Sequence, residues 1–170
     1  MWPQLVEFAK APEYAMALEE AGLGLIELEA IHLYQATPVN TVTFAHSGVG
    51  GTHVGFLATP RTPLDASPVV LTAPLADEPN VVVAGSLHEF LSLGCRQGWS
   101  FLDQFAHDLA WAVEWYETTG APAYPILEDL TRQFGLTPWT DVGARIAVLA
   151  KEHRERLIVR PPDPEEDEWA

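Results

Sequence analysis

Hydrophobic positions recur at helical spacing in the first twenty residues. Leu5 and Phe8 lie on one side of a helix with a period of 3.6 residues. Pro3 suits the first turn of a helix, where its missing N–H group costs nothing. Pro12 is expected to kink the segment 3–20 or to divide it into two short helices, because proline removes a hydrogen bond inside a helix.

The middle of the chain has the β-branched and aromatic runs that are typical of strands. Five segments carry this pattern: 25–34, 41–47, 53–59, 67–75 and 80–85. The first of them also fits a helix, and we favour a strand because its polar and apolar residues alternate in places. The connections between the segments are short and rich in glycine and proline, so antiparallel pairing is expected.

From residue 86 onward the hydrophobic spacing becomes helical. Ser86 and Glu89 have the spacing of a capping box, in which a serine begins a helix and a glutamate follows three residues later. Further helices are predicted over 100–118, 126–134 and 138–155. Strands followed by helices, rather than alternating with them, predict an α+β fold. It would contain an antiparallel sheet of about four to six strands packed against N-terminal and C-terminal helices.

The length of 170 residues suits one domain and is too short for two ordinary ones. We expect a single domain over 1–160, in which 157–159 forms a last strand. The acidic segment 161–170 is predicted to be a disordered tail. The sequence shows neither a secretory signal nor an apolar run long enough to span a membrane, so a cytoplasmic location is expected.

The charge balance limits the classes of partner. Nine lysine and arginine residues stand against 24 aspartate and glutamate residues, which gives a net charge of −15. Lys10 and Arg61 are the basic residues of the first 85 positions, so a basic stripe for nucleic acid is absent there. An anionic membrane is disfavoured for the same reason. A basic protein partner would be attracted, although the acidity could also serve solubility alone.

Several residue groups invite an enzymatic reading. His46 and His53 flank a glycine loop, but neither a cysteine nor a carboxylate lies within that loop to complete a metal site. We therefore expect both histidines to face solvent in the loop rather than to bind a metal. The doublet His107–Asp108 is of a kind found in metal-dependent phosphohydrolases, which gives a small metal-dependent hydrolase as the alternative function. Cys95 lies in a predicted helix, where a small buried side chain is its usual role.

The glycine loop also bears on nucleotide binding. Residues 47–51 read Ser-Gly-Val-Gly-Gly, but a phosphate loop is followed by a helix, and here a strand is predicted instead. The segment is interpreted as a hairpin loop whose glycines adopt positive φ angles.

Two tryptophans suggest a structural role. Trp111 and Trp115 widen the apolar stripe of the predicted helix 100–118, so this helix is expected to be buried on more than half of its circumference. A third reading of the protein is therefore a structural chain that oligomerises through these tryptophans, because aromatic residues are enriched in interfaces.

Residues 40–95 read as a strand, a glycine-rich loop and a strand, followed by an apolar strand and a capped helix. The positions that carry this pattern are Phe44, Ala45, Gly48, Gly50, Gly51, Pro68, Ser86, Glu89, Phe90 and Leu91. In these positions the segment resembles the SUKH superfamily, which includes fungal cell-wall synthesis regulators and bacterial toxin-immunity proteins. The chain lacks the entry motif that often follows the first helix in that family, and it lacks the acidic residue common in the glycine loop.

The resemblance implies an α+β protein that binds other proteins and performs no chemistry. Together with the charge, it leads us to expect an acidic domain that masks a basic partner, for example a toxin, as a monomer or a homodimer. We predict no catalytic residue, no metal and no cofactor. The candidate partner-binding residues lie in the glycine loop and in a later turn: His46, Ser47, Thr52, His53, Asp77 and Glu78.

Overall fold

The computed structural model describes residues 1–29, 34–118 and 124–161. The helices in these ranges are α1 (Trp2–Phe8), α2 (Pro12–Glu20), α3 (Leu87–Gly94), α4 (Gln104–His107), α5 (Leu109–Thr118), α6 (Pro125–Phe134) and α7 (Val142–His153). Two short 3-10 turns are η1 (Leu64–Ala66) and η2 (Arg154–Arg156). The strands are β1 (Gly24–Glu29), β2 (Thr41–His46), β3 (His53–Leu57), β4 (Val69–Thr72) and β5 (Asn80–Ala84).

The five strands form one antiparallel sheet in the order β1-β2-β3-β4-β5. Each strand pairs with the next along the chain, so the sheet is a meander with β1 and β5 at its edges. One row of paired residues crosses the whole sheet, from Gly24 through His46, His53 and Thr72 to Asn80. The β2–β3 and β4–β5 loops therefore leave the sheet at the same end.

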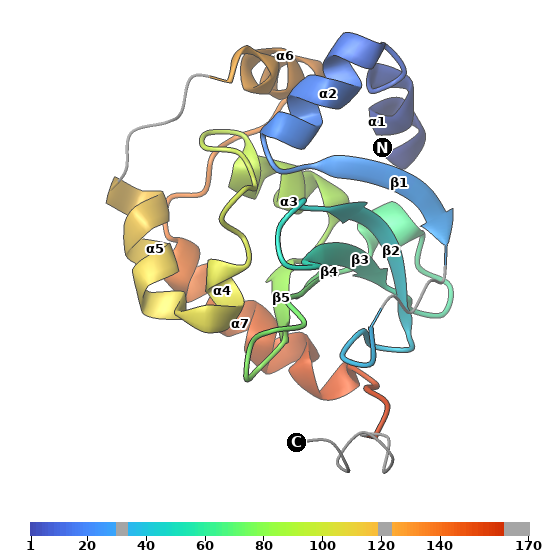
Figure 1. Cartoon of the computed structure of the whole chain (residues 1–170), viewed down its shortest axis with the longest axis vertical. Coiled ribbons are helices and arrows are strands. Elements are labelled where there is room, and N and C mark those ends of the chain that lie inside the picture. Colours follow the sequence, from blue (N-terminus) through green and yellow to red (C-terminus); the bar gives the residue numbers. More distant parts are fainter. Residues whose placement is uncertain (30–33, 119–123, 162–170) are drawn as a thin grey trace.

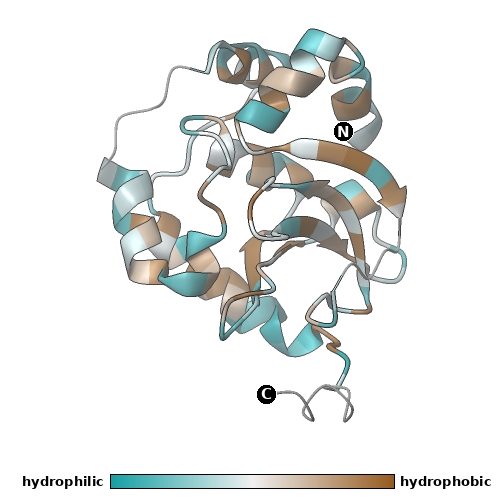
Figure 2. Ribbon diagram, viewed as in Figure 1, coloured by the Kyte–Doolittle hydropathy of each residue, from teal (hydrophilic) through white to brown (hydrophobic). Residues whose placement is uncertain are grey.

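Aromatic side chains form the centre of the core. Phe44 of β2 stacks on Phe56 of β3 with ring centroids 4.3 Å apart, and Trp2 meets both rings edge-on. Phe90 of α3 lies 5.6 Å from Phe44. Helices α1 and α2 lie beside β1, α3 lies behind the sheet and α7 lies beside β5 (Figure 1). Hydrophobic residues dominate the strands (Figure 2). The α+β class, with an antiparallel sheet of five strands and flanking helices, is confirmed.

The capping box also links two distant helices. The Ser86 hydroxyl accepts a hydrogen bond from the Glu89 backbone N–H at 3.2 Å, as the sequence pattern predicts. The Glu89 carboxylate accepts the Gly85 N–H and two hydrogen bonds from Arg145 of α7, at 2.6 and 3.0 Å. Burial raises the pKa of Glu89, but the hydrogen bonds from Arg145 and Gly85 outweigh it and leave the pKa below its usual value.

The helix predicted over 100–118 is interrupted. Asp108 leaves the helical conformation, with φ −149° and ψ 87°, and separates α4 from α5. Its carboxylate accepts the Trp111 N–H at 3.0 Å, so it caps the new helix. The expectation that this helix is buried on more than half of its circumference was also wrong. Leu109 is exposed and Trp111 is 45% exposed, whereas Ala112 and Tyr116 are buried.

Two further boundaries differ from the prediction. The last helix begins at Val142 rather than at 138, because the Asp141 carboxylate accepts the Ala144 N–H at 2.9 Å. Residues 157–159 form no strand. Ile158 instead makes isolated bonds, donating to the Asn40 side chain and accepting the Val39 N–H at 2.7 Å.

The first strand ends at Glu29, and the rest of the segment 25–34 contains positions 30–33, which lie outside the described residues. Nearly all of the predicted tail, 162–170, lies outside them as well. One hydrophobic cluster connects the described ranges, from Leu5 of α1 to Leu149 of α7. Within these ranges, none of the helices has the length and apolar character needed to cross a membrane.

Candidate protein-binding surface

The two segments that carry the predicted site lie together at one end of the sheet. We call residues 47–52 and 73–79 the loop end. A Cβ atom built on Gly50 would lie 3.7 Å from the Leu75 side chain, so the two loops are in contact range. The sheet topology therefore brings the glycine loop and the Asp77–Glu78 turn onto one surface, as a partner-binding surface requires.

The glycine loop is a tight hairpin connection. Gly48, Gly50 and Gly51 have φ angles of 78°, 55° and 76°, which side-chain-bearing residues rarely adopt. The Thr52 N–H donates to the Val49 carbonyl at 2.8 Å, which closes the turn. The hairpin interpretation is confirmed, because strand β3 and not a helix follows the loop. The loop thus lacks the helix N-terminus that a phosphate site uses.

His53 holds the loop from inside the protein. Its side chain is 2% exposed, so the expectation of a solvent-facing histidine is wrong. Nδ1 lies 2.9 Å from the Gly51 carbonyl oxygen, which can only accept, so Nδ1 carries the proton. Nε2 lies 3.1 Å from the Thr37 hydroxyl, and the ring stacks on Tyr34. Burial lowers the pKa of His53, although the Gly51 hydrogen bond opposes this.

The remaining predicted residues differ in accessibility. Thr52 is buried beside His53, so neither side chain can contact a partner while the loop keeps this conformation. His46 and Ser47 are partly exposed, and Asp77 and Glu78 are exposed.

An exposed ion pair adds little to this turn. Glu78 pairs with Arg154 at 2.9 Å, but both side chains are mostly exposed. Such surface pairs contribute at most about 1 kcal/mol.

Two apolar side chains at the loop end were missed by the sequence reasoning. Leu75 is 79% exposed and Val49 is 52% exposed, the first in the β4–β5 turn and the second in the glycine loop. Neighbouring exposed apolar side chains with charged residues beside them are typical of binding surfaces. The available signal was an apolar residue inside the glycine loop and another at the very end of the segment 67–75, directly after Pro74.

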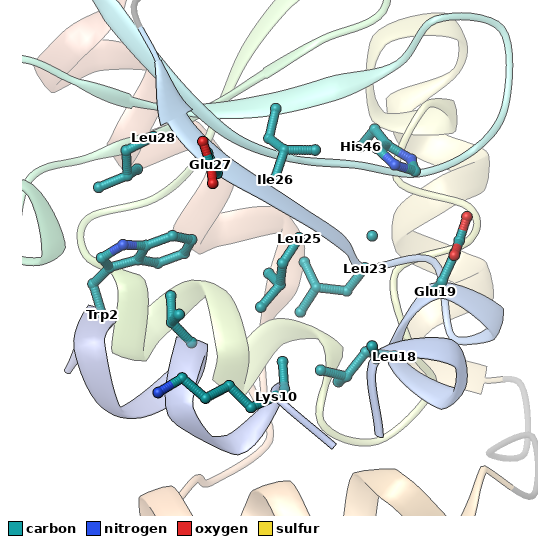
Figure 3. Close-up of a pocket in the computed structure, with 14 residues that line it drawn as sticks. Trp2, Lys10, Leu18, Glu19, Leu23, Leu25, Ile26, Glu27, Leu28 and His46 are labelled. Carbon is teal, nitrogen blue, oxygen red and sulfur yellow. The ribbon is translucent and has the colours of Figure 1, made fainter. Parts of the chain in front are cut away.

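A groove lies next to this surface. It has a volume of about 510 Å³ and runs between β1 and the helices α1 and α2 (Figure 3). We call it the β1 groove. Apolar side chains contribute most of its lining, among them Trp2, Val6, Ala15, Leu18, Leu25 and Ile26.

The His46 ring connects the β1 groove to the loop end. It lines the groove and lies over Gly24, where a Cβ atom would collide with it. His46 belongs to the row of paired residues from which the glycine loop leaves. The groove and the glycine loop of the loop end thus adjoin at His46.

Two of the candidate enzymatic residues, Asp108 and Cys95, make structural hydrogen bonds. Asp108 of the His107–Asp108 doublet caps α5, and His107 lines a cavity of about 320 Å³ beside β5 that Asp77 and Glu78 also border. The Cys95 thiol is buried and donates to the Ser92 carbonyl, and burial raises its pKa. Across 1–29, 34–118 and 124–161, no three histidine, cysteine or carboxylate side chains gather as a metal site would require.

The comparisons with known proteins gave no match to this chain among family models, curated proteins or solved structures.

Proposed function

We propose that the protein is a non-catalytic binding domain that associates with a basic protein through the loop end. The observation that carries this proposal is Leu75, an apolar side chain that is 79% exposed and stands two residues before the carboxylate of Asp77. Interfaces often combine an apolar centre with a polar rim. Leu75 and Val49 would supply the centre, and Asp77 and Glu78 the rim.

The charge of the molecule supports a basic partner. With a net charge of −15, the chain attracts a positively charged surface over a long range and repels nucleic acid and anionic lipid. Electrostatic complementarity selects partners and accelerates their encounter. An acidic face of this kind would compete with nucleic acid for the basic groove of a nuclease.

The resemblance of residues 40–95 to the SUKH superfamily supports the same class of function. Under that reading, the protein is an immunity or regulatory protein whose partner is a toxin or a housekeeping protein. The gene beside its own discriminates between them: a toxin gene directly upstream favours immunity, and a metabolic operon favours regulation.

The test is capture followed by measurement with a purified partner. The full chain is immobilised and exposed to a lysate of its source organism at about 0.05 M salt, and bound proteins are released at about 0.5 M. The expected protein has a net positive charge. Its affinity is then measured by calorimetry, and Leu75→Ser is expected to weaken it at least tenfold, which corresponds to about 1.4 kcal/mol.

Val148→Ser is the matched control, because Val148 is also an exposed apolar residue but lies on α7. It should leave the affinity unchanged. The proposal fails if the captured proteins are acidic, or if the purified partner binds Leu75→Ser as tightly as the unchanged chain.

A further inference from the structure

The β1 groove has the features of a site for part of a partner. Its floor is apolar, since Leu18 and Leu23 are buried, and Trp2 forms one wall. Trp2 is held there by edge-on contacts to Phe44 and Phe56, so this wall is already in place before anything binds. A water molecule occupies roughly 30 Å³, so a groove of about 510 Å³ has room for a few apolar side chains.

Two carboxylates border the groove. Glu19 of α2 and Glu27 of β1 are exposed, and neither forms an ion pair with any residue in the described ranges. Lys10 also lines the groove, but its ammonium group is paired with Glu7 at 2.5 Å. The unpaired charge at the groove is therefore negative.

The edge of the sheet argues against recognition by strand addition. Between Leu25 and Glu29 the pairing of β1 with β2 shifts its register, so the edge strand is irregular where it borders the groove. Irregular edges offer a poor template for another strand. The groove therefore favours recognition by side chains that enter it over recognition by an added strand.

Resting on the proposed function, we infer that the β1 groove binds a short segment of the basic partner in which apolar residues are flanked by lysine or arginine. The apolar side chains fill the groove, and the flanking cations pair with Glu19 and Glu27. Because His46 joins the groove to the loop end, one partner can occupy both surfaces. The groove is then the anchor, and the loop end extends the contact.

The experiment uses two capped five-residue peptides and the full chain. The first has lysine at both ends around leucine, phenylalanine and leucine, and the second has glutamate in place of the lysines. Calorimetry is expected to show at least tenfold tighter binding of the lysine peptide. Glu19→Gln and Glu27→Gln should each reduce its affinity about threefold or more, because each removes one charge-assisted contact.

The control variants lie close to the test positions. Glu20→Gln removes a neighbouring carboxylate of α2 that does not line the groove, and it should leave the affinity unchanged. Ala15→Trp fills the groove from an exposed helical position and should abolish binding. Ala147→Trp places the same side chain on the exposed part of α7 and should leave peptide binding unchanged. Thermal melting checks that both tryptophan variants are folded.

The inference is overturned if the lysine peptide does not bind, if the glutamate peptide binds as well, or if Ala15→Trp leaves binding intact. These outcomes are separate from the test of the proposed function. A purified partner that depends on Leu75 but not on Ala15 would leave the loop end as the binding surface and remove the groove. If the lysine peptide binds but no basic partner is captured, the groove would remain a binding site and the proposed role of the loop end would be removed.

Discussion

A single buried imidazole connects the glycine loop to the segment before β2. His53 donates to the Gly51 carbonyl and accepts from the Thr37 hydroxyl, which in turn accepts the Tyr34 N–H at 3.2 Å. Each group in this chain of hydrogen bonds has one consistent role when the imidazole is neutral. A second proton on the ring would reverse the contact with Thr37, and the hydroxyl would then have to accept from both Nε2 and the Tyr34 N–H.

This network predicts a pH dependence of stability. Because the pKa of His53 in the folded protein lies below the usual histidine value of 6.5, the unfolded chain takes up a proton first as the pH falls. The contribution of His53 to the free energy of unfolding should therefore be constant above about pH 7 and decrease below about pH 6.5, by at most about 1.4 kcal/mol per pH unit. Urea titrations of the unchanged chain and of His53→Gln, from about pH 7.5 down to about pH 5.5, measure this decrease.

The variant isolates one histidine, because His153, whose pKa is also lowered, is present in both proteins. The difference in unfolding free energy between them should shrink as the pH falls. A difference that stays constant would show that His53 carries the same proton in both states.

A comparison of two glycines in the loop distinguishes the cost of backbone strain from the cost of steric crowding. Gly48 and Gly51 have nearly equal φ angles of 78° and 76°. A Cβ atom on Gly48 meets open space, whereas on Gly51 it would collide with the Tyr34 ring. Gly48→Ala should destabilise the protein by about 1–2 kcal/mol through the left-handed backbone. Gly51→Ala should cost at least about 1 kcal/mol more, because Tyr34 must move. Equal melting temperatures for the two variants would contradict this account.

At the scale of elements, the Glu89–Arg145 contact joins α3 to α7. Glu89→Gln keeps the shape of the side chain but removes the charge that receives both Arg145 hydrogen bonds. We expect a loss of about 1–3 kcal/mol in chemical denaturation near pH 7. The lowered pKa of Glu89 means that this difference is present above about pH 4.5 and is lost as the pH falls below it.

The exposed pair of Glu78 and Arg154 is the control for this prediction. Arg154→Gln should change the free energy of unfolding by no more than about 0.5 kcal/mol, because water already solvates both charges. If Glu89→Gln and Arg154→Gln were equally stable, the contact between α3 and α7 would contribute no more to the free energy of unfolding than an exposed ion pair.

The sequence predicted most of the elements because their signals are local. The Pro12 division, the capping box at Ser86 and the end of α6 at Gly135 follow from single residues with strong backbone preferences. The break at Asp108 was missed because aspartate is a cap or an ordinary exposed helical residue, and the apolar stripe continues across it. Residues 157–159 have the composition of a strand but find no ladder partner, which is a tertiary property.

The candidate site was predicted less completely than the fold. The glycine loop and the Asp77–Glu78 turn lie together because both connect strands at the same end of an antiparallel meander. The burial of His53 depends on Tyr34 and Thr37, which come from a distant segment without a sequence motif. The β1 groove depends on how far α1 and α2 lie from the edge strand β1, and residue spacing does not encode the distance between the helices and the strand.

At the scale of the whole molecule, the acidic groups divide between positions 1–161 and the last nine residues. Residues 162–170 carry five of the 24 carboxylates, and the others belong to positions 1–161. Unlike the apolar side chains at the loop end, distant charges act before contact. They change how often two molecules meet more than how long they stay together.

This division predicts how association with a basic partner responds to salt. Exposed charges are screened over about 8 Å at physiological ionic strength, so association should slow strongly between about 0.05 and 0.5 M salt while dissociation changes little. Deleting 162–170 should reproduce part of this slowing at low salt, because it removes five negative charges and none of the loop-end residues. Leu75→Ser should instead accelerate dissociation. Surface plasmon resonance with the partner captured from lysate separates the two rates. An association rate independent of salt would mean that the acidic surface serves solubility alone, and binding would then rest on the apolar contacts.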